Sequence, residues 1–404
     1  MSSESISTVV VYADYVRVFS YFDDWLDAFN QAAGFDVTAI NAVDGNAREV
    51  LRKAVQVAEL VVLLHSMTGD TTKYLESLTS ILQQRRGRLL AFVGNEVNLP
   101  GSPISAKREI LGRISPDFIA TQLPLEAGQF LFGDLASSKV LELPHALNPD
   151  KYVPGSSRDE RTIDIGTRAA RYLPHLGDND RNSIHDYFRC HGSSRFDFKV
   201  DLSSERMTRD QWVGFLRKCR GTVSTEAGSW YLERDDHTVE AIRRWATRRT
   251  KGALTFRSDS ILVSLIESMP SIPRRVLATI KNLGFVKHEL SAAQDLSFTE
   301  VYEEFFRDYK KPEFYGKCIS SRHFDAVGTK TCQIMFPGRF NNILVGDKHY
   351  ITLQRDFSNI QEVVDRFIDP GYWRRMVDEA YESVMDQHTY PHRLERLRDA
   401  LMSD

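Results

Sequence analysis

A segment near the C-terminal end groups residue types that can bind a phosphate and a ribose. It reads Ser320-Ser321-Arg322-His323-Phe324-Asp325-Ala326-Val327-Gly328-Thr329, and an apolar run from Cys332 to Phe336 follows it. Two small hydroxyl residues favour the start of a helix, and the N–H groups and dipole at a helix start attract a diphosphate. Asp325 falls in the first two turns, where a carboxylate can accept hydrogen bonds from both hydroxyls of a ribose. The segment therefore predicts a nucleotide-sugar site, with Thr329 as a further hydroxyl; an ordinary capped helix with an acid near its start is the structural alternative.

The order of the pieces from Cys318 to Leu394 resembles a known family. The pieces are a hydroxyl-Arg-x-Phe-acid-Ala helix from Ser321, the turn Gly328-Thr329, a strand at His349-Tyr350-Ile351, the strand end Asp356-Phe357-Ser358-Asn359 and two closing helices. This order is similar to the C-terminal signature of GT-B glycosyltransferases, in particular the group-1-like (family 4-like) transferases of bacterial polysaccharide biosynthesis clusters. The remainder of the chain resembles them by element order only.

Three positions depart from the family pattern. Asp325 stands where the family usually has glutamate, and Lys330 where a glycine usually follows the helix. Lys317 occupies the place where broader members carry a second acid. These departures concern contacts with the donor, and they leave unchanged the fold class that the resemblance implies: α/β, GT-B, with two Rossmann-like domains facing across a cleft.

The resemblance implies a glycosyltransferase that moves a sugar from a nucleotide diphosphate sugar to a hydroxyl acceptor. The acceptor would be a bacterial surface glycan or another glycoconjugate, lipid-linked ones included. The C-terminal domain would hold the donor, through Ser320, Ser321, Arg322, Phe324, Asp325 and Thr329. Two alternatives stay open: a nucleotide-sugar 2-epimerase of similar architecture, which acts on the donor alone, and a degenerate, non-catalytic nucleotide-sugar-binding subunit, which Lys330 and the missing second acid favour.

Two further segments follow predicted strands of the second half, where open α/β sheets bind ligands. Arg168 and Arg171 come after the strand at 162–166, and guanidinium groups match phosphate oxygens, so we predict that they clamp the donor diphosphate. Glu226, Gly228 and Ser229 come after the strand at 221–224. Relatives carry a Ser/Thr-Glu-x-Gly-Ser element in this place, which implies contact with the donor. A solvated pair of arginines and an ordinary strand-to-loop turn are the structural alternatives.

Acceptor and catalytic groups are expected in the first half of the chain. His65 follows the predicted strand at 60–64, and Glu96 follows the strand at 89–93. An inverting transferase needs a general base within hydrogen-bond reach of the acceptor hydroxyl, and either side chain can serve, whereas a retaining enzyme can work without a protein base. For His65 the alternative is a structural histidine at a strand end.

The elements that must position these residues alternate between apolar runs and amphipathic stretches, the pattern of parallel sheets flanked by helices. In the first half we predict strands at 9–13, 36–40, 60–64, 89–93, 118–121 and 140–143, and helices at 19–33, 47–58 and 71–86. In the second half we predict strands at 162–166, 196–200, 221–224 and 332–336, and helices at 209–217, 236–284, 360–367 and 373–385. No G-x-G-x-x-G follows the first strand, so a dinucleotide site is not indicated. The predicted division is an acceptor domain at 1–155, a donor domain at 156–385 and a helix at 386–404 that returns to the first domain.

Composition limits the partners. The 404 residues carry a formal net charge of −3, so no basic excess points to nucleic acid. The four cysteines form no C-x-x-C pair, and no group has the spacing of metal ligands, so we expect no metal and no cofactor other than the nucleotide-sugar substrate. The N-terminus lacks the layout of a signal peptide and no apolar run suits a membrane span, which predicts a cytoplasmic protein with at most peripheral contact at the inner face of the membrane. The basic stretch around Trp245 fits such a surface, but we favour a solvated helical face.

Overall fold

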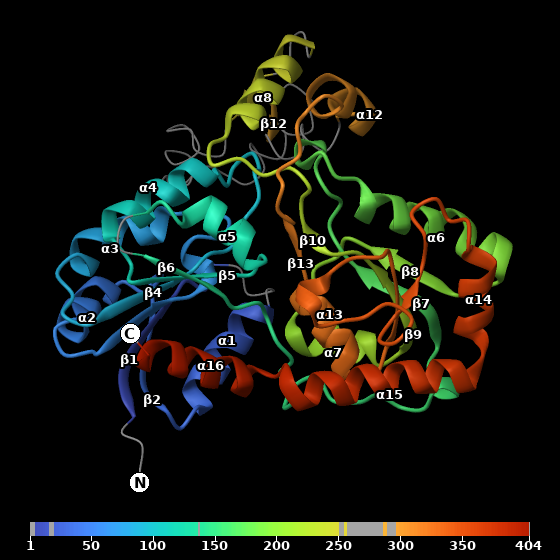
Figure 1. Ribbon diagram of the computed structural model, residues 1–404, viewed down its shortest axis with the longest axis horizontal. Coiled ribbons are helices and arrows are strands. Elements are labelled where there is room, and N and C mark those ends of the chain that lie inside the picture. Colours follow the sequence, from blue (N-terminus) through green and yellow to red (C-terminus); the bar gives the residue numbers. More distant parts are fainter. Residues whose placement is uncertain are drawn as a thin grey trace, which may run out of the picture.

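The protein consists of two α/β domains that lie side by side, and the chain crosses between them after β6 and again before α16 (Figure 1). The computed structural model describes residues 5–15, 20–135, 138–249, 254–256, 286–288 and 296–403. The prediction of two Rossmann-like domains is confirmed, because each domain contains one parallel sheet with helices on its faces.

The N-terminal domain is built on six parallel strands in the order β2-β1-β3-β4-β5-β6. The strands are β1 (Ile6–Tyr12), β2 (Phe35–Asn41), β3 (Leu60–Leu63), β4 (Arg88–Phe92), β5 (Phe118–Thr121) and β6 (Lys139–Glu142). The helices between them are α1 (Ser20–Gln31), α2 (Ala47–Ala54), α3 (Lys73–Leu82), α4 (Ile104–Ile114) and α5 (Leu125–Phe132). Successive residues of β1 enter different hydrophobic clusters, Val9 and Val11 on one face and Val10 on the other, so helices cover both faces of the sheet.

The C-terminal domain contains five parallel strands in the order β15-β14-β9-β7-β8. The strands are β7 (Ile163–Arg168), β8 (Val200–Ser203), β9 (Cys219–Ser224), β14 (Cys332–Met335) and β15 (Ile351–Thr352). The flanking helices are α6 (Asp180–Phe196), α7 (Arg209–Leu216), α13 (Ser321–Gly328), α14 (Ile360–Ile368) and α15 (Pro370–Gln387), and the short strands β10 (Ala227–Gly228) and β13 (Lys317–Cys318) form an antiparallel pair beside the sheet.

The strand order places a topological switch point in each sheet. In the C-terminal domain the chain goes from β7 to β8 on one side and then to β9 on the other side of β7. The carboxyl ends of β7 and β9 therefore border a crevice, the place where open α/β sheets bind ligands. In the N-terminal domain the corresponding point lies between β1 and β3.

The last helix, α16 (Tyr390–Met402), belongs to the core of the N-terminal domain although it follows the C-terminal domain in sequence. Leu394, Leu397 and Leu401 share one hydrophobic cluster with Val10 and Trp25. Figure 1 shows α16 passing beside α1 toward the N-terminal sheet.

The linker between the domains packs on the C-terminal domain already at Leu147 and Tyr152, which share a hydrophobic cluster with Phe324 on α13. The amide of Gly155 donates to the carbonyl of Thr329 at 3.2 Å. Arg161 is almost fully buried and donates to the carbonyl oxygens of Cys219 at 2.7 Å and Thr329 at 2.9 Å. The chain from Tyr152 onward is therefore fixed on the C-terminal domain.

Two predictions of secondary structure are wrong. The strand expected at 196–200 lies four residues later: α6 stops at Phe196 because Asp197 turns left-handed with φ 55°, and β8 runs from Val200 to Ser203. The continuous helix expected at 236–284 ends early: α8 (His237–Arg249) is followed by the strand β11 (Leu254–Phe256), and residues 257–284 lie outside the described part.

The basic stretch lies on α8, whose arginines partly form ion pairs. Arg243 pairs with Glu240, and Arg249 pairs with Glu300 at 3.2 Å. Arg249 also lies over the ring of Trp245 at 4.2 Å. Within the described ranges, no helix is both long and apolar enough to cross a bilayer.

Candidate functional site

A cavity of about 420 Å³ lies between the two domains, at the carboxyl ends of both sheets. The N-terminal domain contributes the residues that follow β4, β5 and β6, including Glu96, Gln122 and His145. The C-terminal domain contributes the loop after β7, with Arg168 and Arg171, and the start of α13. This volume lies within the range of about 300 to 1,000 Å³ that is usual for small-molecule sites.

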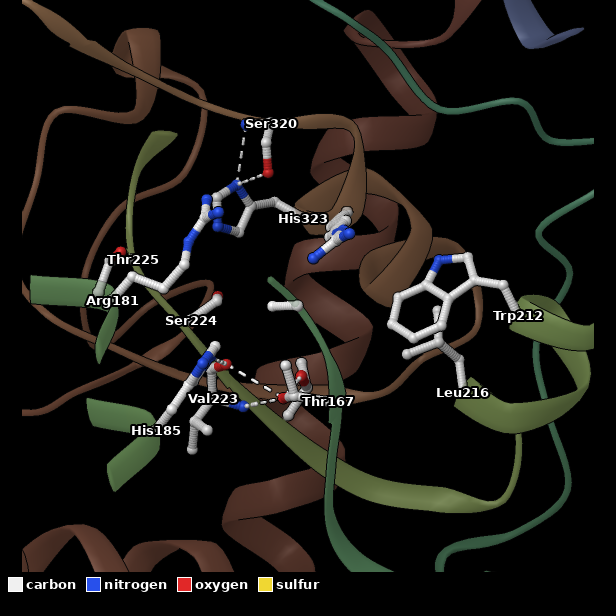
Figure 2. Close-up of a pocket in the computed structure, with 13 residues that line it drawn as sticks. Thr167, Arg181, His185, Trp212, Leu216, Val223, Ser224, Thr225, Ser320 and His323 are labelled. Atoms are coloured by element: carbon white, nitrogen blue, oxygen red, sulfur yellow. Dashed lines mark hydrogen bonds between the residues drawn. The ribbon is translucent and has the colours of Figure 1, made fainter. Parts of the chain in front are cut away.

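A small side pocket, which shares several lining residues with the main cavity, lies at the switch point of the C-terminal sheet (Figure 2). Thr167 at the end of β7 bonds the hydroxyl of Thr222 on β9 at 2.8 Å, and both line the pocket. Arg181 and Trp212 line the pocket and the main cavity alike. Arg181 lies at the start of α6, and its guanidinium group is 3.9 Å from the centre of the Tyr172 ring. This contact holds the guanidinium group beside the side pocket and the main cavity.

The start of α13 faces both spaces, as the sequence predicted for a capped helix. Ser320 is the N-cap residue, and its backbone amide donates to Nδ1 of His323 at 3.0 Å. Ser320 and Arg322 line the side pocket and the main cavity, and Ser321 lines the main cavity. The helix therefore directs its dipole and two hydroxyl groups at the cavity, an arrangement that favours a bound anion.

Asp325 lies one turn further along α13, on the same face, and borders the main cavity. Its side chain is 2% exposed, and Oδ2 accepts a hydrogen bond from Nε1 of Trp212 at 2.8 Å. Burial, with the nearby Asp24 adding to it, raises the pKa of Asp325 well above its usual range. Trp212, on α7, was not identified from the sequence, since an aromatic residue in an amphipathic helix predicts only core packing.

The two arginines predicted to clamp the diphosphate border the main cavity but are already paired with carboxylates. Arg168 makes two hydrogen bonds to Asp201, at 2.8 and 2.9 Å, and lies 3.9 Å over the ring of Phe215. Arg171 makes two to Asp186, at 2.7 and 2.9 Å. A phosphate at either arginine would have to compete with these pairs.

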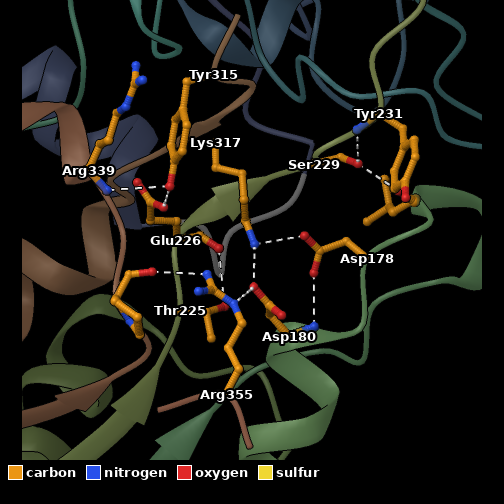
Figure 3. Close-up of polar contacts among 12 residues, drawn as sticks. Asp178, Asp180, Thr225, Glu226, Ser229, Tyr231, Tyr315, Lys317, Arg339 and Arg355 are labelled. Carbon is orange, nitrogen blue, oxygen red and sulfur yellow. Dashed lines mark hydrogen bonds and ion pairs between the residues drawn. The ribbon is translucent and has the colours of Figure 1, made fainter. Parts of the chain in front are cut away.

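The segment after β9 divides between the cavity and the protein interior. Gly228, with φ 90°, borders the main cavity. Ser229 is fully buried and donates to the carbonyl of Leu176 at 2.6 Å. Glu226 is also buried: it accepts from the backbone amide of Phe340 at 2.6 Å and from the hydroxyl of Tyr315 (Figure 3). The structure thus commits Glu226 and Ser229 to internal hydrogen bonds and leaves Gly228 at the cavity wall.

Lys317, the position where the sequence departs from the pattern of a second acid, is buried and lies in a network of charges (Figure 3). Its ammonium contacts Asp178 at 2.7 Å and Asp180 at 2.9 Å, and Arg355 contacts Asp180 at 3.1 Å. Burial alone would lower the pKa of Lys317, but the two carboxylates outweigh burial and raise it. Lys317 therefore fixes the start of α6 beside β13.

Lys330, directly after the turn that ends α13, has a left-handed backbone. Its φ is 51°, in the left-handed region that glycine adopts without steric cost. Its ammonium pairs with Asp378 on α15 at 2.6 Å. Lys330 therefore adopts the left-handed conformation while Asp378 holds its ammonium.

Glu96 is the candidate base that lies at the cavity. Its carboxylate accepts from the hydroxyl of Thr121 at 2.5 Å and from the backbone amide of Gln122 at 2.8 Å. Burial raises the pKa of Glu96 to about 7, although these hydrogen bonds and Lys107 oppose the shift. A carboxyl group that titrates near neutral pH is suited to accept a proton from an acceptor hydroxyl.

His65 has no exposed surface and borders neither the main cavity nor the side pocket. It lies between Trp25, Phe92 and His145, with ring centroids 4.9 to 5.9 Å apart. Burial lowers the pKa of His65 well below its usual value, so the imidazole is neutral. Direct proton transfer from an acceptor in the cavity would require His65 to become exposed.

Two other predicted residues, Phe324 and Thr329, also lie away from the cavity. Phe324 points into the hydrophobic cluster behind α13. The hydroxyl of Thr329 donates to the carbonyl of Asp325 at 2.9 Å and so closes the end of the helix. Among the described residues, no three His, Cys, Asp or Glu side chains are grouped so that they could hold a metal ion.

No protein-family model and no curated protein sequence matches this chain. Several solved structures are similar in fold. HepE of Anabaena, in complex with UDP and glucose, is 9% identical over 99% of this chain and 100% of its own, with a TM-score of 0.47. A glycosyltransferase of Rickettsia africae is 8% identical over 98% and 97%, also with a TM-score of 0.47. The N-terminal domain of trehalose-6-phosphate phosphatase of Candida albicans is 10% identical over 98% and 96%, with a TM-score of 0.43. These likenesses are too distant to support an inference about activity.

Proposed function

We propose that this protein is a glycosyltransferase that uses a nucleotide diphosphate sugar and transfers the sugar to a hydroxyl acceptor. The observation that carries the proposal is the cavity itself, which joins the start of α13 in one domain to Glu96 in the other. A donor held by the C-terminal domain would present its sugar toward the N-terminal domain, where an acceptor would meet a carboxyl group with a pKa of about 7.

Charge and hydrogen bonding support one position for the proposed donor. Its diphosphate would lie at the start of α13, where the positive end of the helix dipole attracts an anion. Ser320, Arg181 and Arg322 line both the side pocket and the main cavity there, and the two guanidinium groups suit phosphate oxygens. Its ribose would lie at Asp325, one helical turn away. Because arginines and a helix start can neutralise the leaving diphosphate, the proposed reaction uses no metal ion. The acceptor would be a bacterial surface glycan or another glycoconjugate.

We favour Arg181 and Arg322 for the diphosphate because both line the side pocket and the main cavity at the start of α13, whereas Arg168 and Arg171 line the main cavity alone. We expect Arg181→Ala and Arg322→Ala to weaken binding of a nucleoside diphosphate by about tenfold or more, since each removes a charge-assisted hydrogen bond, and to affect the nucleoside little. Calorimetry with both ligands measures the difference. Equal losses for both ligands would place these arginines outside the phosphate site.

The function is tested by thermal-shift titration with UDP, GDP, dTDP and CMP, followed by turnover of the matching nucleotide sugars with and without a glycan acceptor. Transfer that needs the acceptor supports the proposal. Conversion of the donor sugar without any acceptor would instead indicate an epimerase. Binding with neither hydrolysis nor transfer would indicate a non-catalytic nucleotide-sugar-binding subunit.

A further inference from the structure

The turn after β14 adopts an unusual backbone conformation. Phe340, Asn341 and Asn342 have φ values of 45°, 52° and 58°, so three consecutive residues other than glycine are left-handed. Such conformations persist only where the surroundings enforce them, and they gather at functional sites. Glu226 holds the left-handed turn in place, because its carboxylate accepts a hydrogen bond from the backbone amide of Phe340 at 2.6 Å. The ring of Phe340 is buried in the core. Contacts within the C-terminal domain therefore stabilise the strained backbone of this turn.

The left-handed turn projects the side chain of Asn341 between the two domains. On the C-terminal side, Oδ1 of Asn341 accepts from the backbone amide of Ile319 at 2.8 Å, next to the N-cap of α13. On the N-terminal side, its Nδ2 donates to Oε1 of Glu142 at 2.8 Å and to the carbonyl of Gln122 at 3.2 Å. The orientation of the amide group follows from these partners, because Ile319 offers a donor and the other two offer acceptors.

The same contacts reach the candidate base and the candidate donor site. The backbone amide of Gln122 donates to Oε2 of Glu96 at 2.8 Å, so Asn341 is bound to the residue that holds Glu96. Ile319 directly precedes Ser320, which caps the helix at the cavity. One side chain thus connects the peptide that positions Glu96 to the peptide that positions the start of α13. Arg339, in the same turn, adds a second contact between the domains, with Glu126 at 3.2 Å (Figure 3 shows Arg339).

We propose that Asn341 is a positioning residue that fixes the carboxyl group of Glu96 relative to a donor bound at the start of α13. This inference rests on the proposed function. Asn341 does not touch the reacting atoms; it sets how the two halves of the site meet. Because transfer depends steeply on the distance and orientation of the reacting groups, loss of this contact should affect turnover much more than donor binding.

The test compares Asn341→Gly with the matched control Asn342→Gly. Glycine accepts the left-handed backbone at both positions, so each variant keeps the turn, and only the first removes the amide contacts. We expect Asn341→Gly to lower kcat by roughly 10- to 100-fold while the Kd for UDP and the KM for the donor stay within about threefold, and Asn342→Gly to match the wild type. Hydrogen exchange of the peptides that contain Ile319 and Gln122 should become faster in Asn341→Gly alone.

A swap of partners checks that the contact with Glu142 carries the effect. Asn341→Asp keeps the acceptor for Ile319 but turns a carboxylate toward Glu142, so it should also lower kcat. Glu142→Gln offers an amide donor in return, so the double variant should recover the part of kcat that depends on Glu142, while the carbonyl of Gln122 stays without its donor. Failure of this rescue, together with a kcat for Asn341→Gly equal to that of Asn342→Gly, would overturn the positioning role.

The outcomes separate this inference from the proposed function. An active wild type in which Asn341→Gly behaves like Asn342→Gly overturns the role of Asn341 alone. A loss of UDP affinity as large as the loss of kcat overturns it as well, because Asn341 would then support the donor site and not its placement. A wild type that turns over no nucleotide sugar overturns both, whereas the exchange measurement still shows whether Asn341 joins the two peptides.

Discussion

Replacing Asp325 with asparagine and with alanine should separate its structural contact from its proposed contact with ribose. Asp325 accepts from Nε1 of Trp212 at 2.8 Å in a nearly closed environment. Alanine leaves this buried indole N–H without its acceptor, which costs about 1 to 3 kcal/mol of stability. Asparagine keeps an oxygen for Trp212 but replaces the second oxygen with an N–H₂ group, which cannot accept from a ribose hydroxyl. Asp325→Asn should therefore stay folded and lose the ribose contact.

The size of the ribose contact can be measured with a nucleoside diphosphate and its 2′,3′-dideoxy analogue. In the wild type, at a pH above the raised pKa of Asp325, hydrogen bonds from the hydroxyls to the ionised carboxylate should contribute about 1.5 to 3 kcal/mol, or roughly 10- to 150-fold in Kd. In Asp325→Asn and Asp325→Ala the two ligands should bind with nearly equal affinity. Isothermal titration calorimetry gives all six dissociation constants. A preference for the ribose form that is as large in the variants as in the wild type would refute the assignment.

The raised pKa of Asp325 makes a second, independent test. Burial disfavours the charged carboxylate in the folded state, so the folded protein binds more protons than the unfolded protein between the usual pKa of aspartate and the raised value. The contribution of Asp325 to stability is therefore present at low pH and is lost as the pH rises through this window. Asp325→Asn cannot ionise, so its free energy of unfolding should fall less than that of the wild type between pH 4 and pH 8. Parallel curves in urea unfolding would show that Asp325 is not perturbed.

Three further changes test other parts of the site. Glu96→Gln should lower kcat by about 10²- to 10⁴-fold, and wild-type kcat should rise with pH through about 7, where Glu96 loses its proton; a flat pH–rate profile would argue against Glu96 as the base. Transfer should survive excess EDTA, and a loss that manganese or magnesium restores would contradict the proposed metal-free reaction. Removal of residues 389–404 takes Leu394, Leu397 and Leu401 out of the N-terminal core, a loss of about 5 to 9 kcal/mol against a total stability of about 5 to 15 kcal/mol. The truncated protein should therefore fail to fold its N-terminal domain, and a cooperative thermal transition with full activity would contradict this.

Much of the fold could be predicted because its signals are local. The apolar run at Leu60–Leu63 is a buried strand in the structure as in the prediction, and β1, β4, β5, β7 and β9 were found in the same way. The helix α13 was recognised from its cap, since Ser320 precedes an amphipathic stretch. The helix α6 was not recognised, because Gly192, Ser193 and Ser194 near its end are poor helix formers and its apolar pattern is weak. Packing of Ile184 and Phe188 into the core of the C-terminal domain stabilises it nonetheless.

The sequence by itself determined that two parallel sheets follow one another and that a capped helix with Asp325 lies at the end of one of them. Apolar periodicity and capping are properties of neighbouring residues, so they can be recognised without the fold. Only the tertiary structure decided which polar groups are available to a ligand. Arg168 is bound to Asp201 and Glu226 to Phe340, partners 33 and 114 residues away in sequence. The position of Asn341 between the domains is likewise a result of packing, because no local pattern records which distant backbone groups a side chain meets.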